Sequence, residues 1–372
     1  SLPALAILKP DTAIDPPRRL ARLTVNLGAI RANWRTFATR AGHAEAAAVI
    51  KADAYGLGAH EAALALAAEG ARTMFVATAG EGLAARRTLG DAHYIYVLNG
   101  PGPADIGVFE KAHLFPVLND MRQIALWTRA GAPVAAALHV DTGMNRLGLA
   151  MADLGAAREA LALADVPLVM SHLACASEPG HPLNALQAQR FTEAAALFPG
   201  ARRSLSATAG ALHGPSMHFD MIRPGVGLYG DTGLDGDGPA LAVAAVLEAP
   251  ILQVRDIAAG DTVGYGATFV AARPMRTATI ALGYADGYLR AASQRGYGVL
   301  AGARCPVLGR VSMDLITLDV TAAGDAAHPG AHVEMLGSEV PLRDVAVAAG
   351  TAPYEVLTSL SGATRVHVRG AS

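Results

Sequence analysis

A lone lysine closes an apolar run early in the chain. Residues 46–50 read Ala-Ala-Ala-Val-Ile, Lys51 follows directly, and Tyr55, Gly56 and Gly58 come shortly after. Such apolar runs are typical of buried strands in parallel sheets. A lysine at the exit of one lies in low-dielectric surroundings, which favour its neutral, nucleophilic amine. That amine could form a Schiff base with an aldehyde. The alternative is a structural lysine that reaches solvent from the strand end.

Four more side chains with chemical uses stand where other apolar runs end. They are Asp141, His172, Ser206 and Arg223. In a parallel α/β barrel the carboxyl ends of the strands converge on one mouth, where active sites form. The sequence therefore predicts that these side chains and Lys51 meet there.

Two loops carry groups that could bind anions. Residues 141–148, DTGMNRLG, place Arg146 after one of the runs, and a guanidinium can grip a carboxylate with two parallel hydrogen bonds. The alternative for this segment is an exposed arginine in a helix-capping turn. Residues 223–230, RPGVGLYG, offer backbone N–H groups of a glycine-rich loop to an anion such as a phosphate.

The elements that must position these groups form a regular series. Eight apolar, strand-like runs are found at residues 46–51, 74–78, 93–98, 114–118, 134–141, 167–173, 203–208 and 221–228. Helical segments lie between most of them, at 59–69, 80–89, 120–130, 152–164 and 184–198. Repeated strand–helix units favour parallel pairing, and eight of them favour a closed (β/α)8 TIM-type barrel. We assign residues 21–238 to it.

The texture of the sequence changes after the barrel segment. Residues 231–239, DTGLDGDGP, are rich in turn formers, and the apolar segments that follow are short and separated by Gly, Pro and Asp. We therefore expect a mainly β domain over residues 239–372, with a helical stretch at 343–349. Residues 1–20 contain four prolines and are expected to form an extended lead-in.

Composition narrows the class of protein. The 372 residues are 52% hydrophobic and 17% charged, with a net charge of −2, which suits a large core and gives no electrostatic case for nucleic acid. No apolar run reaches membrane-spanning length, and the start lacks the basic region and cleavage pattern of a signal peptide. Cys175 and Cys305 are predicted to be reduced thiols, with one long-range disulfide as the alternative. We expect a soluble, cytoplasmic protein.

The lysine segment also resembles a known family. Residues 48–58, AVIKADAYGLG, resemble the pyridoxal-phosphate attachment signature of alanine racemases. Further strings similar to that family follow in its order: DTGMNRLG, RPGVGLYG, TVGYGATF, GYADGYLR, GRVSMDL and APYEVL. The resemblance implies pyridoxal 5′-phosphate as cofactor, interconversion of L- and D-alanine for cell-wall synthesis or L-alanine breakdown, and a head-to-tail homodimer with shared active sites.

The resemblance also implies catalytic and substrate-binding roles. Lys51 would carry the cofactor as a Schiff base and act as the base on the D-alanine face, and Tyr265 of the partner subunit would act on the L-alanine face. Arg146 and the main-chain amide of Met313 would bind the substrate carboxylate. Tyr284, together with Tyr354, would narrow the entrance.

The cofactor would be held by residues from both domains. By resemblance, His172 would stack on the cofactor ring and Arg223 would face its pyridine nitrogen, where an arginine cannot accept a proton and so favours simple racemisation. The phosphate would be bound by Tyr55, Ser206, Gly225, Val226 and Tyr354.

Four residues, in three segments, depart from the family pattern. His139 replaces a lysine, often carbamylated, that orients the arginine, so Arg146 is expected to be held by another group, such as a bound chloride. Arg202 and Leu205 replace the usual histidine and asparagine that precede the phosphate serine, so Arg223 needs other support. Ser312 replaces a cysteine at the pocket wall.

Several other functions are compatible with parts of this pattern. A pyridoxal-phosphate racemase acting on serine or basic amino acids would differ in pocket size, and relative rates would distinguish it. A decarboxylase of the same barrel family is disfavoured by Tyr265 and Arg223. A pyridoxal-phosphate carrier or regulatory protein would lack the second domain, and a purely structural barrel would take up no cofactor.

Overall fold

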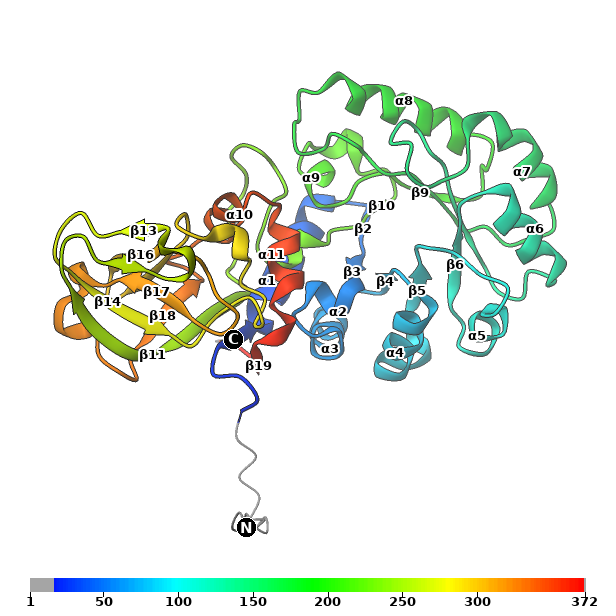
Figure 1. The fold of residues 1–372 in the computed structure, drawn as a ribbon. Helices are drawn as coiled ribbons and strands as arrows, with labels where there is room; N and C mark the ends of the chain where they lie inside the picture. The colour runs from blue at the N-terminus through cyan, green and yellow to red at the C-terminus, as the bar shows by residue number, and fades with distance from the viewer. Residues whose placement is uncertain (1–16, 371–372) are drawn as a thin grey trace, which may run out of the picture.

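The computed structural model describes residues 17–370, so most of the predicted lead-in lies outside the described residues. Eight parallel strand segments form the barrel (Figure 1). They are β2 Glu45–Ala46 continued by β3 Ala48–Val49, β4 Thr73–Val76, β5 Tyr94–Val97, β6 Phe115–Leu118, β7 Ala137–His139, β8 Leu168–Met170, β9 Arg202–Ser204 and β10 Met221–Ile222. Seven of them pair in the order β3-β4-β5-β6-β7-β8-β9.

The ring closes through β10. This strand pairs with β2 in parallel, and a bridge between Ala207 and Arg223 joins it to the chain just after β9. The Arg223 N–H donates to the carbonyl oxygen of Ser206 at 2.8 Å. The predicted (β/α)8 barrel is therefore confirmed, and each predicted run overlaps a strand of the barrel.

Short helices connect the strands on the outside of the barrel. They are α3 Ala59–Glu69, α4 Ala79–Leu89, α5 Ile106–Lys111, α6 Met121–Arg129, α7 Leu154–Ala160, α8 Pro182–Ala195 and α9 Thr208–Ala211, and α1 Leu27–Ala41 precedes the first strand. Local caps set several starts: Thr78 and Glu81 form a capping box on α4, and Asp120 caps α6. Helices as brief as α5 and α9 explain how the barrel fits into so few residues.

The barrel interior is filled by one side chain or two from most strands. The members of this core are Ala47, Val49, Phe75, Tyr96, Val117, Ala137, Leu168, Met170 and Met221. Because strand side chains alternate between two faces, the residue two positions after each also faces inward, at the carboxyl end of its strand. The interior core thus fixes which residues reach the barrel mouth.

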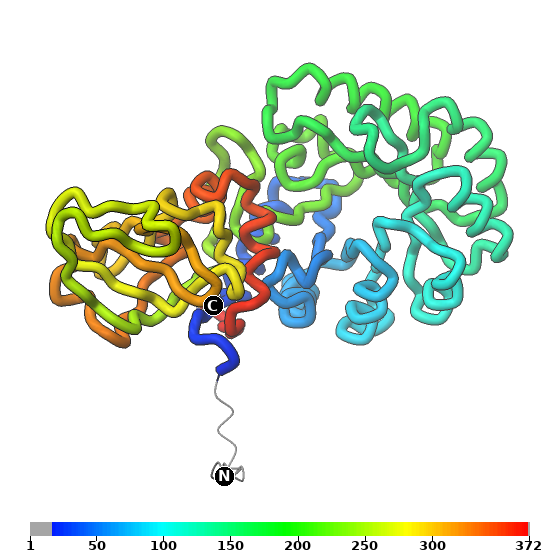
Figure 2. Tube along the Cα trace, in the orientation of Figure 1, coloured from blue at the N-terminus to red at the C-terminus, as the bar shows by residue number. Residues whose placement is uncertain are grey.

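A second, mainly β unit follows the barrel and forms a separate lobe beside it (Figure 2). It contains an eight-stranded sheet. Its order is β14-β17-β16-β15-β18-β11-β1-β19, with a further pairing between β14 and β11. The strands are β1 Arg22–Asn26, β11 Ala245–Ile257, β14 Met275–Ile280, β15 Tyr297–Leu300, β16 Ala303–Leu308, β17 Ile316–Asp319, β18 His332–Leu336 and β19 Thr364–Val368. A small hairpin, β12 Thr262–Val263 and β13 Phe269–Val270, and helices α10 Leu342–Ala349 and α11 Pro353–Ser359 complete it.

Two features of this sheet differ from the sequence-based expectation. We placed residues 22–26 with the barrel, but β1 pairs with β11 and β19 of the second sheet. The sequence does not distinguish the two, because the alternating buried residues Leu23 and Val25 would suit a strand of either sheet. The short apolar segments on either side of Pro250 lie in one long strand, β11, whose pairing register shifts between Leu247 and Glu248 and again between Ile251 and Gln253. The boundaries 21–238 and 239–372 stay a prediction.

Both cysteines, Cys175 and Cys305, are free in the described part of the chain. Within residues 17–370, no helix combines the length and the apolar character needed to cross a membrane.

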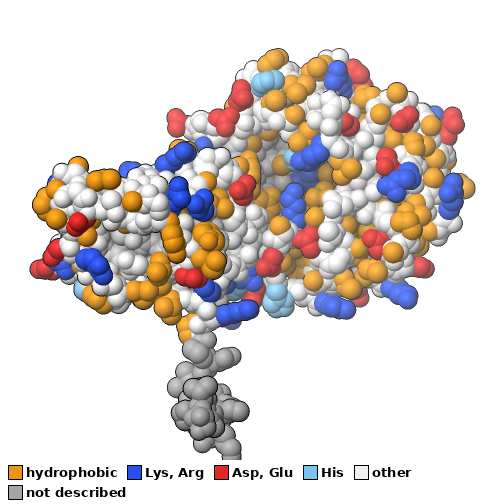
Figure 3. All heavy atoms as spheres, viewed as in Figure 1, with side chains coloured by type: hydrophobic (Ala, Val, Ile, Leu, Met, Phe, Trp, Pro, Cys, Tyr) orange, Lys and Arg blue, Asp and Glu red, His pale blue; other side chains and the backbone are white. Residues whose placement is uncertain are grey.

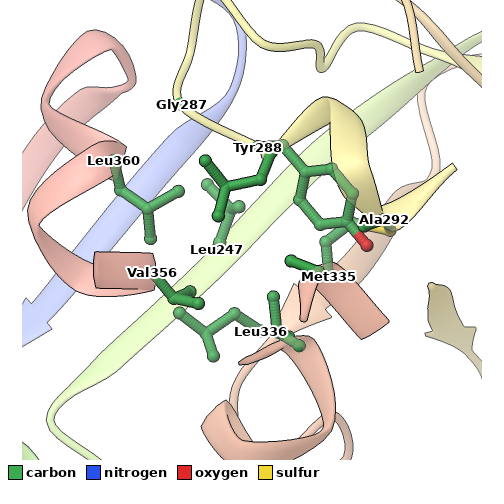
Figure 4. A pocket seen from close by; sticks show the side chains of 11 residues that line it. Leu247, Gly287, Tyr288, Ala292, Met335, Leu336, Val356 and Leu360 are labelled. Atoms are coloured by element: carbon green, nitrogen blue, oxygen red, sulfur yellow. The ribbon is translucent and has the colours of Figure 1, made fainter. Parts of the chain in front are cut away.

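A cavity inside the second unit is a packing feature and not a candidate site. It lies among β11, β18, α10 and α11 and is lined mainly by apolar side chains, including Leu247, Met335, Leu336, Val356 and Leu360 (Figure 4). The Tyr288 ring also lines it, and the buried Tyr288 hydroxyl has no hydrogen-bond partner among the described residues. A single hydroxyl in an otherwise apolar cavity is not enough to orient a polar ligand.

This orphaned hydroxyl predicts the effect of a conservative substitution. Tyr288→Phe should leave the free energy of unfolding unchanged or raise it by about 1 kcal/mol, because it removes a buried polar group that lacks a partner. Tyr297→Phe is the matched control, since the Tyr297 hydroxyl donates to Asp344 and its loss should destabilise the protein. Urea unfolding would measure both. A clear loss of stability in the first variant would show that its hydroxyl has a partner after all.

Candidate active site

Four predicted site residues stand two positions after a buried residue of the strand before them: Lys51 after Val49, His172 after Met170, Ser206 after Ser204, and Arg223 after Met221. His139, which was not predicted as a site residue, follows Ala137 in the same way, and all of these preceding residues except Ser204 belong to the core inside the barrel. The pKa of His172 reflects their proximity, because it is lowered first by burial and then by the nearby charges of Arg223, Arg146 and Lys51. The space-filling view shows basic and histidine side chains gathered in a hollow on this face (Figure 3).

Lys51 begins a short element, α2 Lys51–Tyr55, with unusual backbone geometry. Ala52, Asp53, Ala54 and Tyr55 all have φ between 51° and 56°, which is the left-handed helical region. Non-glycine residues pay about 1–2 kcal/mol each to adopt it. Four in succession persist only where the surroundings hold them, and such strain is concentrated at functional sites. In the sequence, only the two glycines that follow, Gly56 and Gly58, indicate a turn here.

The Glu81 carboxylate holds the first residue of this turn. It accepts hydrogen bonds from the backbone N–H groups of Ala52, Ala77 and Thr78, so it joins the end of β3 to the start of α4. The pKa of Lys51 is lowered by burial and by the positive charge of Arg146, while Glu81 acts in the opposite direction. Burial is the largest cause, so the site favours the neutral amine, as the sequence predicted.

Arg223 is almost fully buried and bonds to neutral groups. Its guanidinium donates to the Ser204 carbonyl oxygen at 2.8 Å, the Ser204 hydroxyl at 2.6 Å and the Ser171 carbonyl oxygen at 2.6 Å. Nη2 also lies 3.5 Å from His172 Nδ1. Burial lowers the pKa of Arg223 to about 9, so it keeps its charge at neutral pH. Ser204, which sequence reasoning missed, therefore supplies the support that Leu205 cannot.

His172 is held as a neutral imidazole beside this guanidinium. Burial is the main cause of its lowered pKa, and Arg223 is the next. Its carbonyl oxygen accepts from Gln187 Nε2 at 2.8 Å, and Gln187 also donates to the Thr142 hydroxyl at 3.0 Å. The ring is therefore carried on a hydrogen-bonded strand end.

A cradle for an anion or a ring lies between Tyr55 and the 223–230 loop. A β-carbon at Gly225 would overlap the Tyr55 hydroxyl, so only glycine allows the loop to approach that closely. The Thr208 hydroxyl accepts from the N–H groups of Gly225 and Gly227 and fixes the loop. Among the described residues, no acceptor is found for the N–H of Val226, which begins the helical turn η4 Val226–Tyr229. A phosphate group fits this arrangement of hydroxyl and backbone N–H.

Ser206 lies beside the start of the 223–230 loop, and Tyr354 lies near Tyr55. The Ser206 hydroxyl donates to the Met217 carbonyl oxygen at 2.7 Å, and it is buried. Tyr354, on α11, lies close enough to Tyr55 to contribute to the raised pKa of the Tyr55 phenol. The structure thus brings a residue of the second unit to the cradle, although α11 itself was not predicted.

Asp141 has a different place from the one predicted. One of its carboxylate oxygens accepts from the N–H groups of Gly143, Met144 and Asn145, at 3.0, 3.0 and 3.1 Å. This carboxylate oxygen therefore organises the backbone of its own loop. Arg146, at the exposed tip of that loop, has no hydrogen bond or ion pair within the described residues of one chain. Its expected anion partner stays a prediction.

His139 lies below the arginine loop in a hydrogen-bonded pocket. Its Nδ1 is 2.8 Å from Asn119 Oδ1, and the Asn119 amide donates to the carbonyl oxygens of Leu98 and Val117. These two bonds identify the NH2 end of the Asn119 side chain, so the atom that faces His139 is the amide oxygen. This oxygen accepts a hydrogen bond, and His139 Nδ1 therefore carries the proton. Nε2 is then an uncharged acceptor. Burial, with Arg223 nearby, lowers the pKa of His139 to about 4.

This buried histidine predicts an acid-dependent loss of stability. In the unfolded chain His139 is protonated below its ordinary pKa of about 6.5, whereas in the folded chain it becomes protonated only near pH 4, because its pKa is lowered to about 4. The free energy of unfolding is therefore unaffected by His139 above pH 6.5 and decreases as the pH falls towards 4, by about 3 kcal/mol in all. His139→Gln should flatten the decline in unfolding midpoint between pH 7 and 4.5, and His60→Gln, at an exposed site, should not. An unchanged decline in the first variant would contradict this assignment.

The remaining predicted residues lie on the surface of the second unit. Tyr265 begins the helical turn η5 Tyr265–Ala267 and is 73% exposed, and Met313 is 54% exposed. Tyr284 is also exposed. No hydrogen bond joins Tyr265 to the barrel within the described residues of one chain. In the part of one chain that the structure describes, the Tyr265 phenol is therefore exposed and not bonded to the barrel.

An arginine from the N-terminal end fixes two of these surface loops. Arg19 pairs with the buried Asp286 at 2.8 Å and with Asp314 at 2.8 Å. The backbone N–H of Tyr284 donates to Ser312, and that of Ala285 donates to Met313. The loops that carry Tyr284 and Met313 are thus one connected unit.

Comparison with known proteins covers nearly the whole chain. The family model "Alanine racemase, N-terminal domain" matches residues 25–233, and "Alanine racemase, C-terminal domain" matches residues 244–368. An alanine racemase of Methylobacterium sp. (strain 4-46) is 47% identical over 349 residues, which is 91% of this chain and 95% of that protein.

Solved structures agree with this match. The alanine racemase of Bartonella henselae, solved with covalently bound pyridoxal phosphate, superposes with a TM-score of 0.89 at 35% identity, covering 94% of this chain and 99% of that chain. The biosynthetic alanine racemase of Pseudomonas aeruginosa gives a TM-score of 0.88 at 35% identity, with the same coverage of both chains.

Proposed function

The chain belongs to the alanine racemase family, and we propose that it interconverts L-alanine and D-alanine with pyridoxal 5′-phosphate as its cofactor. The observation that carries this proposal is the barrel mouth, where a desolvated Lys51 and a buried Arg223 without a carboxylate partner lie beside a cradle of Tyr55 and Gly225. Pyridoxal phosphate, when bound, withdraws electrons from an amino acid joined to it and so acidifies the α-proton.

The residues of the mouth fit such a group. Lys51 would attach it, His172 would pack against its ring, and Arg223 would face the ring nitrogen. The Arg223 guanidinium can only donate hydrogen bonds and is held by neutral partners, so the ring nitrogen would accept from it and stay unprotonated. The phosphate would bind to the hydroxyls and N–H groups of Tyr55, Ser206, Gly225, Val226 and Tyr354.

Two groups would exchange the α-proton. Burial lowers the pKa of the Lys51 amine and so favours its neutral form, and this amine would take the proton from, or return it to, the D-alanine face. Tyr265 of the partner subunit would serve the opposite face. Racemisation requires a proton to leave one side of a planar carbon and another to arrive on the other side, so the two groups must stand on opposite sides of it.

The substrate carboxylate would be bound between the two units. Arg146, which has no partner among the described residues of its own chain, is free to receive a carboxylate, and the main-chain amide of Met313 would complete that site. Tyr284 and Tyr354 would narrow the entrance and limit the size of the substrate side chain.

We further propose a head-to-tail homodimer. Large apolar side chains stay exposed around Tyr265 on the second unit: Val270 is 57% exposed, Met313 54% and Leu315 41%. Exposed apolar groups of this size commonly mark protein–protein contacts. Burying them against the barrel mouth of a second copy would bring Tyr265 to Lys51. Free Cys175 and Cys305 support our assignment of the protein to the reducing cytoplasm.

Turnover of alanine tests this function directly. Purified protein is incubated with L- or D-alanine, with and without added pyridoxal phosphate, and optical rotation is followed to zero. We expect racemisation that depends on the cofactor and runs faster with alanine than with serine or lysine. A protein that takes up no cofactor would refute the proposal, and faster turnover of serine or lysine would reassign the substrate.

A further inference from the structure

The last strand of the chain fastens the left-handed turn that follows Lys51. On β19, Arg365 Nη1 donates to Asp53 Oδ2 at 2.6 Å and to the Gly56 carbonyl oxygen at 3.0 Å. Two residues later, His367 Nε2 lies 2.7 Å from the Leu57 carbonyl oxygen. Residues two apart on a strand share a face, so both side chains reach the turn from one side.

The turn and this C-terminal segment are also packed against each other. A β-carbon at Gly58 would lie 2.6 Å from His367 Nε2, and one at Gly56 would lie 2.6 Å from the carbonyl oxygen of Leu357 in α11. Both glycines also have positive φ, which is 84° for Gly56 and 101° for Gly58. Figure 1 shows α11 and β19 beside α2. The two glycines therefore allow a contact that leaves the turn no room to move outwards on this side.

External contacts of this kind are what the turn requires. Residues 52–55 adopt a conformation that their side chains disfavour, so the turn would relax if it were not held. Asp53 is a junction between two such contacts, because its Oδ1 accepts from the N–H of Ala59 at 2.7 Å while its Oδ2 receives Arg365. Glu81 holds the start of the turn from the barrel side. Arg365 and His367 hold its end from the second unit.

We propose that Arg365 and His367 are positioning residues for Lys51. By holding residues 53–57 they keep the left-handed turn closed and the lysine amine directed into the barrel mouth. The second unit thus sets the position of the barrel's reactive amine within the same chain, through a segment that also carries Tyr354 on α11. This inference rests on the proposed role of Lys51.

The small number of lysines makes the test direct. The sequence has only Lys9, Lys51 and Lys111, and Lys111 is exposed and serves as an internal reference. In cofactor-free protein, competitive labelling with an amine-specific acetylating reagent, read by mass spectrometry from pH 6 to 11, gives a titration midpoint for each. We expect Lys51 of the wild type to titrate below Lys111. In Arg365→Ala/His367→Ala the Lys51 midpoint should rise, closing most of that gap.

Matched variants identify the cause of such a shift. Arg365→Lys keeps the charge opposite Asp53 and should restore part of the wild-type midpoint. Arg31→Ala removes a comparable ion pair, 2.7 Å from Glu69 at the end of α3, and should leave the Lys51 midpoint unchanged. In cofactor-loaded protein, Arg365→Ala should lower kcat more than it changes KM, because the substrate carboxylate site is untouched.

Each outcome decides the proposal. A wild-type Lys51 midpoint in the folded double variant overturns it. If the double variant does not fold, as judged by circular dichroism, Arg365→Ala alone is read in the same way, because the backbone pairing of β19 with β1 does not need that side chain. Failure of the proposed function is seen separately: borohydride treatment of cofactor-loaded wild type would then leave no pyridoxyl group on Lys51.

Discussion

Lys51→Ala is expected to abolish racemisation of both enantiomers, with a loss of at least about 10³-fold. Lys51 comes two residues after Val49, whose side chain lies inside the barrel, and burial favours the uncharged form of the lysine amine. It is therefore placed both to attach the cofactor and to move a proton. The loss should be equal in the two directions, because each turnover uses both faces of the substrate carbon. Polarimetry from L- and from D-alanine measures it.

A labelling comparison separates the role of Lys51 from a folding defect. Wild-type protein treated with borohydride in the presence of pyridoxal phosphate should carry the reduced cofactor on the Lys51 peptide. Lys111→Ala, at an exposed lysine, should keep both the label and the activity. Retained turnover in folded Lys51→Ala would rule out the assigned role.

The barrel could be predicted because each of its strands is encoded locally. Parallel strands are buried on both faces, so they appear as apolar runs, and the helices between them begin at caps such as Thr78 and Asp120. The place of β1 could not be predicted in this way. Leu23 and Val25 show that the strand is buried, but its partners β11 and β19 lie more than 200 residues away.

The candidate site was predictable to a similar degree. Residues at strand ends were found because the strand positions fix them. Residues whose side chains support the site from behind were missed: Ser204 holds Arg223, Asn119 orients His139, and Glu81 holds Ala52. These are ordinary polar residues, and only the folded chain shows what they contact. Asp141 was placed in the site because it ends a run, yet its carboxylate is used within its own loop.

The most distant contacts were the least predictable. Arg365 is 312 residues from Asp53 in the sequence, and nothing near either residue indicates the pair. The left-handed turn was equally hidden, because Ala52, Asp53 and Ala54 carry no local preference strong enough to announce it. Glycine was the only signal for unusual backbone, and it marked the end of the turn without revealing its four preceding residues.

Mixing two inactive variants is expected to restore activity. Tyr265→Phe should reduce turnover strongly, by roughly 10²-fold or more, since it removes one of the two proton-exchanging groups. If Tyr265 of one subunit serves Lys51 of the other, a dimer of one Lys51→Ala chain and one Tyr265→Phe chain contains one site with both native residues. Its second site lacks both.

The size of the recovery distinguishes shared sites from separate ones. Equal amounts of the two variants, dissociated and reassembled at random, give half mixed dimers, each with one working site of two, so about a quarter of wild-type turnover should return. Sites built within one chain would give no recovery at any ratio. Tyr265 is 73% exposed and bonded to nothing in its own barrel, which favours the first outcome. Recovery without dimers in sedimentation would contradict the shared arrangement, because separate chains cannot combine their residues.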